Sequence, residues 1–421
     1  MEKTRIGKEA IDLGFDFLVT DNYKYSVIKG QSKEPISPDF NLIFFDENTY
    51  VNSYTKGFWT PRELLGLTIV NAIKRNAKVV LVDFNFSGQS PVVVDNGQTI
   101  DDTSRYLAYL QTAAELARKN NASIVVPLPS GARSPKGYIE ILSRYRDVFK
   151  AANFSGLRDS SSGLVRRFAW YSYNADYAPV LSANLLSYLL LRHDRDSAAL
   201  KEAEAAVVGA ESPASELSPE LIDALRPENN SISTRIIFRI LPREMVRRNY
   251  GTGPDLLRGV MWLPGQVNGP NMAEPDFGGK AVLIGSDYRD NGDYHDTAFG
   301  MMSGSFILAN SVNTILTGSM AERPKLVNLA LLIGIGLFAC YAFAYIERFI
   351  PTTIFLAFAF LTPSLSAFFF NRYGIFLDVW IPVLAVNLVN FLVDRSALAL
   401  TVATRVKTVG RLIPLIRSRP R

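Results

Sequence analysis

The sequence predicts an α/β domain, with a mainly parallel sheet flanked by helices, followed by three transmembrane helices. Before Pro324, short apolar runs alternate with segments that carry apolar residues at helical spacing, an order typical of parallel α/β folds. After Pro324 come three long apolar runs that are almost free of charge. We therefore expect an α/β domain over residues 1–322, a membrane region over 323–394 and a basic tail over 395–421.

The composition fits a chain that is partly globular and partly embedded in a membrane. Of 421 residues, 48% are apolar and 20% are charged, which is too apolar for an ordinary soluble protein and too charged for a wholly embedded one. The single cysteine excludes a disulfide framework and a multi-cysteine metal site, and the two histidines argue against a histidine-rich zinc centre. The net charge of +5 is only mildly basic, so the placement of the charges is more informative than their sum.

The strands of the domain are expected where short apolar runs end in an acid or a turn. The first three alternate with helices in a β-α-β-α-β order, which predicts parallel strands joined by right-handed crossovers. A segment rich in Ala, Glu, Ser and Pro, over about residues 195–230, is interpreted as a mobile insertion with some helix. The expected strands are 41–46, 78–83, 123–128, 235–240 and 280–284.

The helices are expected from capping residues and periodicity. Thr60 is the expected N-cap of the first helix, because Pro61 suits the first helical position and Glu63 completes a capping box. A second helix should open at the two aspartates of 101–119, and 303–316 should form a closing helix.

The apolar runs near the C-terminus are long enough to cross a membrane. About 20 residues at 1.5 Å each span a hydrocarbon layer of about 30 Å, and these runs are apolar on every face, which disfavours three buried helices of a soluble domain. Asp378 is the one charge within them, near an end of the third run. The runs are 326–346, 349–370 and 373–393.

Charge placement predicts the topology. Seven basic residues and no acidic residue follow Asp394, which places the tail in the cytoplasm, and three crossings then place residues 1–322 on the outer side of a bacterial inner membrane. The first 40 residues contain no signal peptide and no apolar run of sufficient length. Two alternatives stay open: an export signal lies upstream, or the domain faces the cytoplasm.

Carboxylates follow the predicted strands, where a parallel sheet usually binds ligands. Asp46, Asp83 and Asp287 should meet at one edge if their strands are neighbours, with Trp59 and Arg62 near the same edge. The alternative is that Asp46 and Asp83 only cap the turns that follow. The candidate residues for binding a small ligand are Asp46, Trp59, Arg62, Asp83, Asp287 and Asp293.

The segment 286–296 is rich in acids, but its spacing does not match an EF-hand, so we expect no metal there. His295 is interpreted as a surface imidazole held by Asp293 or Asp296, the alternative being a titratable group or a metal ligand. No nucleophile–base set and no phosphate-binding loop occurs, so we expect no catalytic residue and no cofactor. Arg166 and the residues after it are typical of an amphipathic strand, and no nucleic acid is expected as a partner.

Several motifs together resemble a known family. Their order in the chain is Asp46, Trp59-Thr-Pro-Arg62, Lys78 to Phe86, Gly163-Leu-Val-Arg-Arg167, Gly279 to Gly285, Asp293, Asp296-Thr297 and Gly304 to Gly318. This pattern resembles the type-2 CHASE domain, an extracellular sensory domain associated with bacterial cyclases and histidine kinases. The resemblance implies an α/β sensory domain outside the cytoplasm followed by three spans, but it identifies no ligand. An unknown small ligand is expected as a partner.

The expected function is that of a membrane-anchored extracytoplasmic sensor that signals through separate partner subunits. The alternative is a non-enzymatic structural or accessory subunit of a larger bacterial membrane complex. Both require a homo-oligomer or other membrane-complex subunits. Small residues would allow close helix packing, and they recur at Gly334, Gly336, Ala339 and Ala342. The basic tail is expected to contact anionic membrane lipids.

Overall fold

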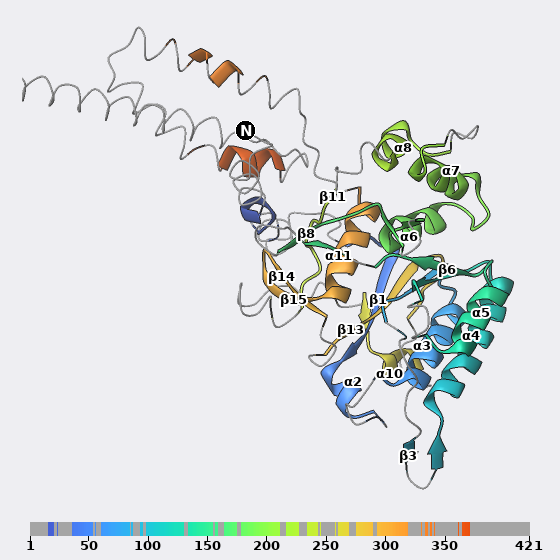
Figure 1. Cartoon of the computed structure of the whole chain (residues 1–421). Coiled ribbons are helices and arrows are strands. Elements are labelled where there is room, and N and C mark those ends of the chain that lie inside the picture. Colours follow the sequence, from blue (N-terminus) through green and yellow to red (C-terminus); the bar gives the residue numbers. More distant parts are fainter. Residues whose placement is uncertain are drawn as a thin grey trace, which may run out of the picture. The chain divides into compact units, whose positions relative to one another are not determined.

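The structure is a computed structural model of the chain, which divides into two compact units, Val19–Ala321 and Met1–Leu18 with Glu322–Arg421 (Figure 1). It describes residues 16–20, 23, 36–53, 55, 60–84, 86, 93–95, 98–129, 134–154, 156–158, 164–174, 178–210, 216–226, 234–242, 245, 257, 260–268, 275–288, 293–318, 330, 333–335, 337–338, 341, 361 and 364–370.

A six-stranded sheet forms the centre of the larger unit. Every neighbouring pair in it is parallel, in the order β12-β1-β13-β2-β5-β6. The late strand β13 therefore lies between the two earliest strands, β1 and β2. This confirms the expected mainly parallel α/β sheet. The strands are β1 (Phe40–Asp46), β2 (Val79–Val82), β5 (Ser123–Pro127), β6 (Phe149–Ala152), β12 (Met261–Trp262) and β13 (Ala281–Asp287).

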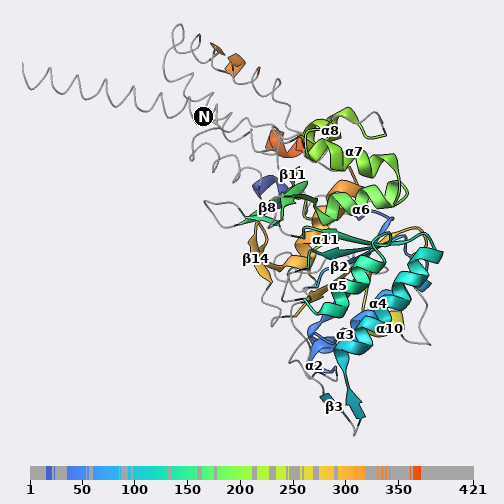
Figure 2. The ribbon, with the colours of Figure 1, turned by 45° about the vertical axis from the view of Figure 1, so that its right-hand side comes forward.

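Helices cover both faces of the sheet (Figure 2). On one face α3 (Arg62–Lys74) packs against α4 (Asp102–Lys119) and α10 (Pro264–Asn268), with α5 (Lys136–Arg144) beside α4. On the other face, α6 (Ala183–Arg192) and α11 (Gly304–Leu316) pack against each other and against the strands. The expected helices 101–119 and 303–316 are thus confirmed within one residue of their ends.

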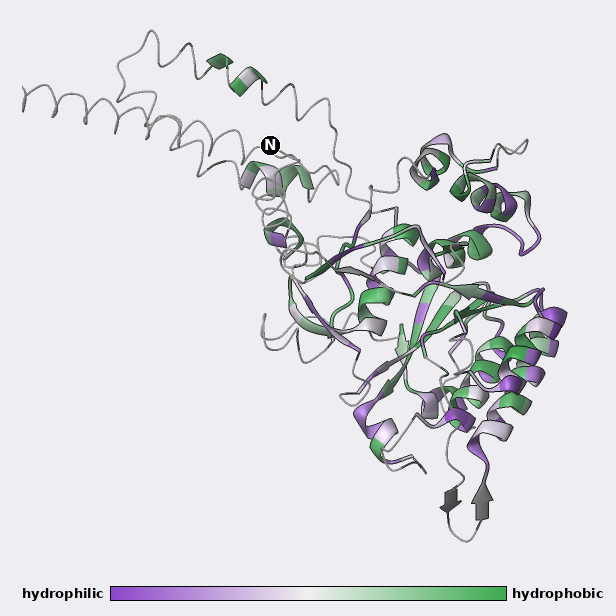
Figure 3. Cartoon of the chain, viewed as in Figure 1, coloured by the Kyte–Doolittle hydropathy of each residue, from purple (hydrophilic) through white to green (hydrophobic). Residues whose placement is uncertain are grey.

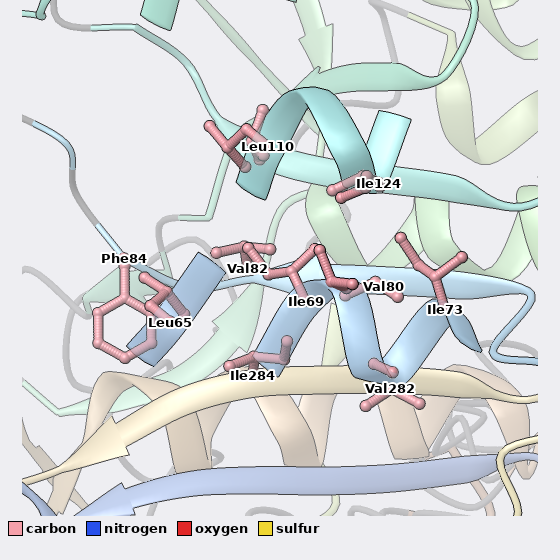
Figure 4. Close-up of a cluster of buried hydrophobic side chains, with 14 of the residues drawn as sticks. Leu65, Ile69, Ile73, Val80, Val82, Phe84, Leu110, Ile124, Val282 and Ile284 are labelled. Carbon is pink, nitrogen blue, oxygen red and sulfur yellow. The ribbon is translucent and has the colours of Figure 1, made fainter. Parts of the chain in front are cut away.

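The core under α3 shows how the strands are oriented (Figure 4). Leu65, Ile69 and Ile73 recur every four residues on α3, are fully buried, and pack in one cluster with Val80 and Val82 of β2. The central strands are largely apolar, while hydrophilic residues gather on α4 and α5 (Figure 3).

Alternation along the strands then decides which face the strand-end acids occupy. Phe45, Val82 and Ile284 belong to the cluster under α3, and successive strand side chains point to opposite faces. Asp46 and Asp83 come one residue after Phe45 and Val82, and Asp287 comes three residues after Ile284. All three acids therefore lie on the face covered by α11. Phe44 confirms the assignment, because its ring stacks on Phe306 of α11 at 4.4 Å.

Smaller elements surround this framework. Within the region 195–230, the described residues include the helices α7 and α8, and Glu202 accepts hydrogen bonds from the backbone of residues 216 and 217 that lead into α8. The smaller elements are α2 (Glu47–Val51), β3 (Val93–Asp95), β4 (Gln98–Ile100), β7 (Gly156–Arg158), β8 (Val165–Phe168), β9 (Tyr171–Tyr173), β10 (Pro179–Leu181), α7 (Ala198–Val207), α8 (Pro219–Leu225), β11 (Thr234–Arg235), β14 (Tyr294–Thr297) and β15 (Gly300–Ser303).

Two expectations about local structure are wrong. The strand expected at 235–240 pairs only through β11, because the backbone beyond it bonds to side chains of α11 instead: Asn310 Oδ1 accepts the N–H of Ile240 at 2.8 Å. Thr60 does not cap α3, since Pro61 occupies the N-cap position and the Thr60 hydroxyl bonds to Tyr288 Oη at 2.7 Å.

Most residues of the three expected membrane spans lie outside the described residues, and all of 373–393 does. Within the parts of the chain that the structure describes, no helix has both the length and the apolar character needed to cross a membrane.

Candidate functional site

Three carboxylates lie at the ends of β1, β13 and β2. Asp46 and Asp287 are register partners on neighbouring strands, which lie about 4.8 Å apart in a sheet. Asp83 follows β2, and its backbone N–H donates to the carbonyl of Ile284 at 2.9 Å, which sets it level with Gly285. The strands are therefore neighbours, as the predicted convergence of these acids required.

Helix α11 begins at the same edge, in close contact with the sheet. A Cβ on Gly285 would lie 2.6 Å from Cβ and Oγ of Ser305, and a Cβ on Gly304 would overlap the carboxylate of Asp293. The N–H of Gly304 donates to the carbonyl of Asp293 at 2.7 Å. Two glycines thus allow the first turn of α11 to approach both the sheet and the segment before β14.

Ser305 connects the helix to Asp83. Its hydroxyl donates to Asp83 Oδ2 at 2.7 Å and accepts the backbone N–H of Ser286 at 3.1 Å. Burial raises the pKa of Asp83 to about 7; the hydrogen bond from Ser305 opposes the rise and the negative charge of Asp293 adds to it. Asp83 is therefore a half-buried carboxyl group that changes charge near neutral pH.

Asp293, whose charge acts on Asp83, is exposed to solvent. Its Oδ1 lies 2.7 Å from Nε2 of His295, as expected for an imidazole held by this acid. The side chains of His295 and Asp293 are 22% and 43% exposed, so water and small solutes reach the pair directly. We call Asp83, Asp293, His295 and Ser305 the edge cluster.

The other two strand-end acids make local contacts. Asp46 Oδ1 accepts the backbone N–H of Thr49 at 2.8 Å and its hydroxyl at 2.6 Å, which is the N-cap of α2. The capping alternative is therefore right for Asp46. Asp287 Oδ1 accepts the hydroxyl of Tyr294 at 3.1 Å.

Of the predicted basic and aromatic residues, the structure describes only Arg62. Arg62 opens α3, which packs on the face of the sheet opposite to that of α11. Burial raises the pKa of Tyr106 well above its ordinary value, and the Arg62 charge acts in the opposite sense. Trp59 lies outside the described residues.

A model of the CHASE2 domain family matches residues 12–344. The chain belongs to the CHASE2 domain family. Such domains are extracellular sensory domains, so the resemblance noted in the sequence is confirmed and sensing outside the cytoplasm is the function that membership implies. No curated protein and no solved structure matches the chain.

Sequence reasoning missed two residues of this CHASE2 domain. Asp102 was expected only to open α4, yet its carboxylate is fully buried and accepts the backbone N–H groups of Arg62 at 3.2 Å and Glu63 at 2.7 Å, capping α3. The signal was present: of two adjacent aspartates only one can cap α4, and Asp101 does so. Ser305 had a weaker signal, since only its place after Gly304 at a helix start marks it.

The chemistry of the edge cluster favours positive charge or a proton. Carboxylates accept hydrogen bonds and attract cations. Within the described residues, no three His, Cys, Asp or Glu side chains are grouped so that they could hold a metal ion. The carboxylates of the cluster are suited to binding a cationic group or to taking up a proton themselves.

Proposed function

We propose that this CHASE2 protein is a membrane-anchored extracytoplasmic sensor that reads its stimulus at the edge cluster and signals through separate partner subunits. The single observation that carries the proposal is the contact between Asp83 and Ser305. It joins the solvent-facing carboxylates to the first turn of α11 at 2.7 Å. A change of charge or occupancy at the cluster acts on this helix directly.

Helix α11 is well suited to transmit such a change. Beyond its first turn, Asn310 and Thr314 bond the backbone of residues 237–240, and Asn313 Oδ1 accepts the backbone N–H of Ser37 at 2.8 Å. The helix therefore moves as a unit with the segments it holds. It ends at Leu316, shortly before the predicted membrane region, so its displacement would be passed toward the spans.

Thermal unfolding tests the proposal with the full chain in mild detergent. The probes are methylamine, spermidine, glycine betaine, Mg²⁺ and Ca²⁺, each at fixed pH. A ligand at 100 times its dissociation constant stabilises the folded state by about 2.7 kcal/mol, which is easily seen as a shift in Tm. We expect at least one amine to raise the Tm of the natural chain and not that of Asp83→Asn.

Asp147→Asn is the matched control, because Asp147 pairs with Arg118 at 2.7 Å near the opposite edge of the sheet. It should keep the response to the amine. A ligand that stabilises all three chains equally would place the binding elsewhere and contradict the proposal.

A further inference from the structure

We propose that the docking of α11 on the sheet is controlled by a proton at the edge cluster: loss of the proton from Asp83 releases the first turn of α11. This inference rests on the proposed function, because it names the regulation of the same site. In it, external pH acts on the sensor through the carboxyl group that Ser305 contacts.

The docked state holds Asp83 in a place that disfavours its charge. The side chain follows β2 on the face covered by α11, it is partly shielded from water there, and Ser305 is its hydrogen-bonding partner in the docked helix. Asp293 lies close by, with its carboxylate against Gly304. An ionised Asp83 therefore meets a second negative charge at short range, and only movement of α11 or of the segment before β14 would give it more water.

The groups facing Asp83 include no compensating fixed positive charge among the described residues. On β13 the nearest titratable group is Asp287, and α11 contributes only hydroxyl groups at this end. On α6, which contacts β2, Arg192 is occupied by Asp39 at 3.1 Å, at the amino end of β1.

Two further elements near Asp83 are β5 and β14. Next to β2 on its other side, β5 ends at Pro127 and is followed by Leu128, and neither residue carries a charge. Before and within β14, Asp293 and His295 form the ion-pair geometry at 2.7 Å. His295 therefore contacts Asp293, the acid whose negative charge acts on Asp83.

The sign and range of the effect follow from linkage. The pKa of Asp83 is about 7 in the docked state and 3.8 in an ordinary carboxyl group. The docked state therefore binds the proton more tightly, so docking is strongest below about pH 4, weakens as the pH rises toward 7, and is constant above that. The difference limits the change in the docking equilibrium to on the order of a thousandfold.

Hydrogen exchange tests this inference with the full chain in mild detergent between pH 5 and pH 8.5. The informative amides are those of 281–288 and 304–316, since the N–H of Ser286 bonds to Ser305 only while α11 is docked. After correction for the intrinsic rate, protection should fall at least tenfold from pH 5 to 7 and level off above pH 7.5. Asp83→Asn, a neutral substitute that can still accept the Ser305 hydroxyl, should show constant protection.

Asp46→Asn is the control, because Asp46 lies at the same edge but caps α2; it should keep the pH response. A natural chain whose protection does not change with pH, or an Asp83→Asn variant that keeps the response, would overturn the inference. The amine experiment at fixed pH separates the two proposals. An amine response without a pH response leaves the sensor proposal standing and rejects proton control. A pH response without any amine response supports proton control and rejects amine binding.

Discussion

Replacing Gly285 by alanine tests whether the close approach of α11 to β13 is as tight as the structure indicates. The new Cβ would lie 2.6 Å from Ser305 Cβ and 3.3 Å from Phe44 Cε1, where ordinary contacts are about 3.5–4.0 Å. Neither side can move easily, because β13 pairs with strands on both sides and Phe44 stacks on Phe306. We expect a loss of about 1–3 kcal/mol in the free energy of unfolding, the usual cost of overpacking.

Urea and thermal unfolding measure this loss, and each kcal/mol should lower Tm by roughly 2–4 °C in a unit of this size. Gly265→Ala is the matched control, since nothing lies within 4 Å of the added Cβ and alanine is favoured in a helix. It should leave the stability unchanged or raise it by up to about 1 kcal/mol. If Gly285→Ala were as stable as the control and exchange in α11 were unchanged, the argument from close packing would be wrong.

Three further predictions concern a cap, a charge and the assembly. Asp101→Ala should lower the free energy of unfolding by about 1 kcal/mol at neutral pH, measured by urea unfolding, because the carboxylate accepts the N–H of Ser104. Bonding to Ser104 lowers the pKa of Asp101, so this stabilisation is lost only as the pH falls below the ordinary pKa of an aspartate. An equal loss of stability at pH 2 and pH 7 would contradict this. Asp83→Asn should be more stable than the natural chain at pH 8 but not at pH 4, because the pKa of Asp83 is raised to about 7. The gain at pH 8 is at most about 4 kcal/mol, and it is smaller where water reaches the half-buried carboxyl group. A variant that is less stable than the natural chain at pH 8 would refute this. Native mass spectrometry of the detergent-extracted protein should show a homo-oligomer or co-purifying subunits, and a lone monomer of 46.7 kDa would count against signalling through partners.

The strand ends could be predicted from the sequence because local chemistry determines them. Asp46 and Asp83 follow short apolar runs, and such runs become buried strands whose ends an aspartate can cap. What the sequence could not reveal is the insertion of β13 between β1 and β2, because the order of parallel strands depends on packing between distant segments. That insertion is what brings Ser305 against Asp83.

The capping of α3 also depends on a contact between distant segments. A capping box at Thr60 is a valid local pattern, yet Asp102, some 40 residues away, caps α3 instead. The strand expected at 235–240 failed for a similar reason, since Asn310 offers its backbone better partners than a neighbouring strand would. In both cases a tertiary contact replaced the local one.

The central claim is that the domain bearing the edge cluster faces the outside of the cell. Met301 is 62% exposed on β15, two residues before the N-cap of α11, so Met301→Cys in a Cys340→Ser background gives a single reactive thiol beside the site. A membrane-impermeant maleimide applied to intact spheroplasts should label this thiol as completely as it does after lysis. Labelling that appears only after lysis would place the domain in the cytoplasm and contradict the account.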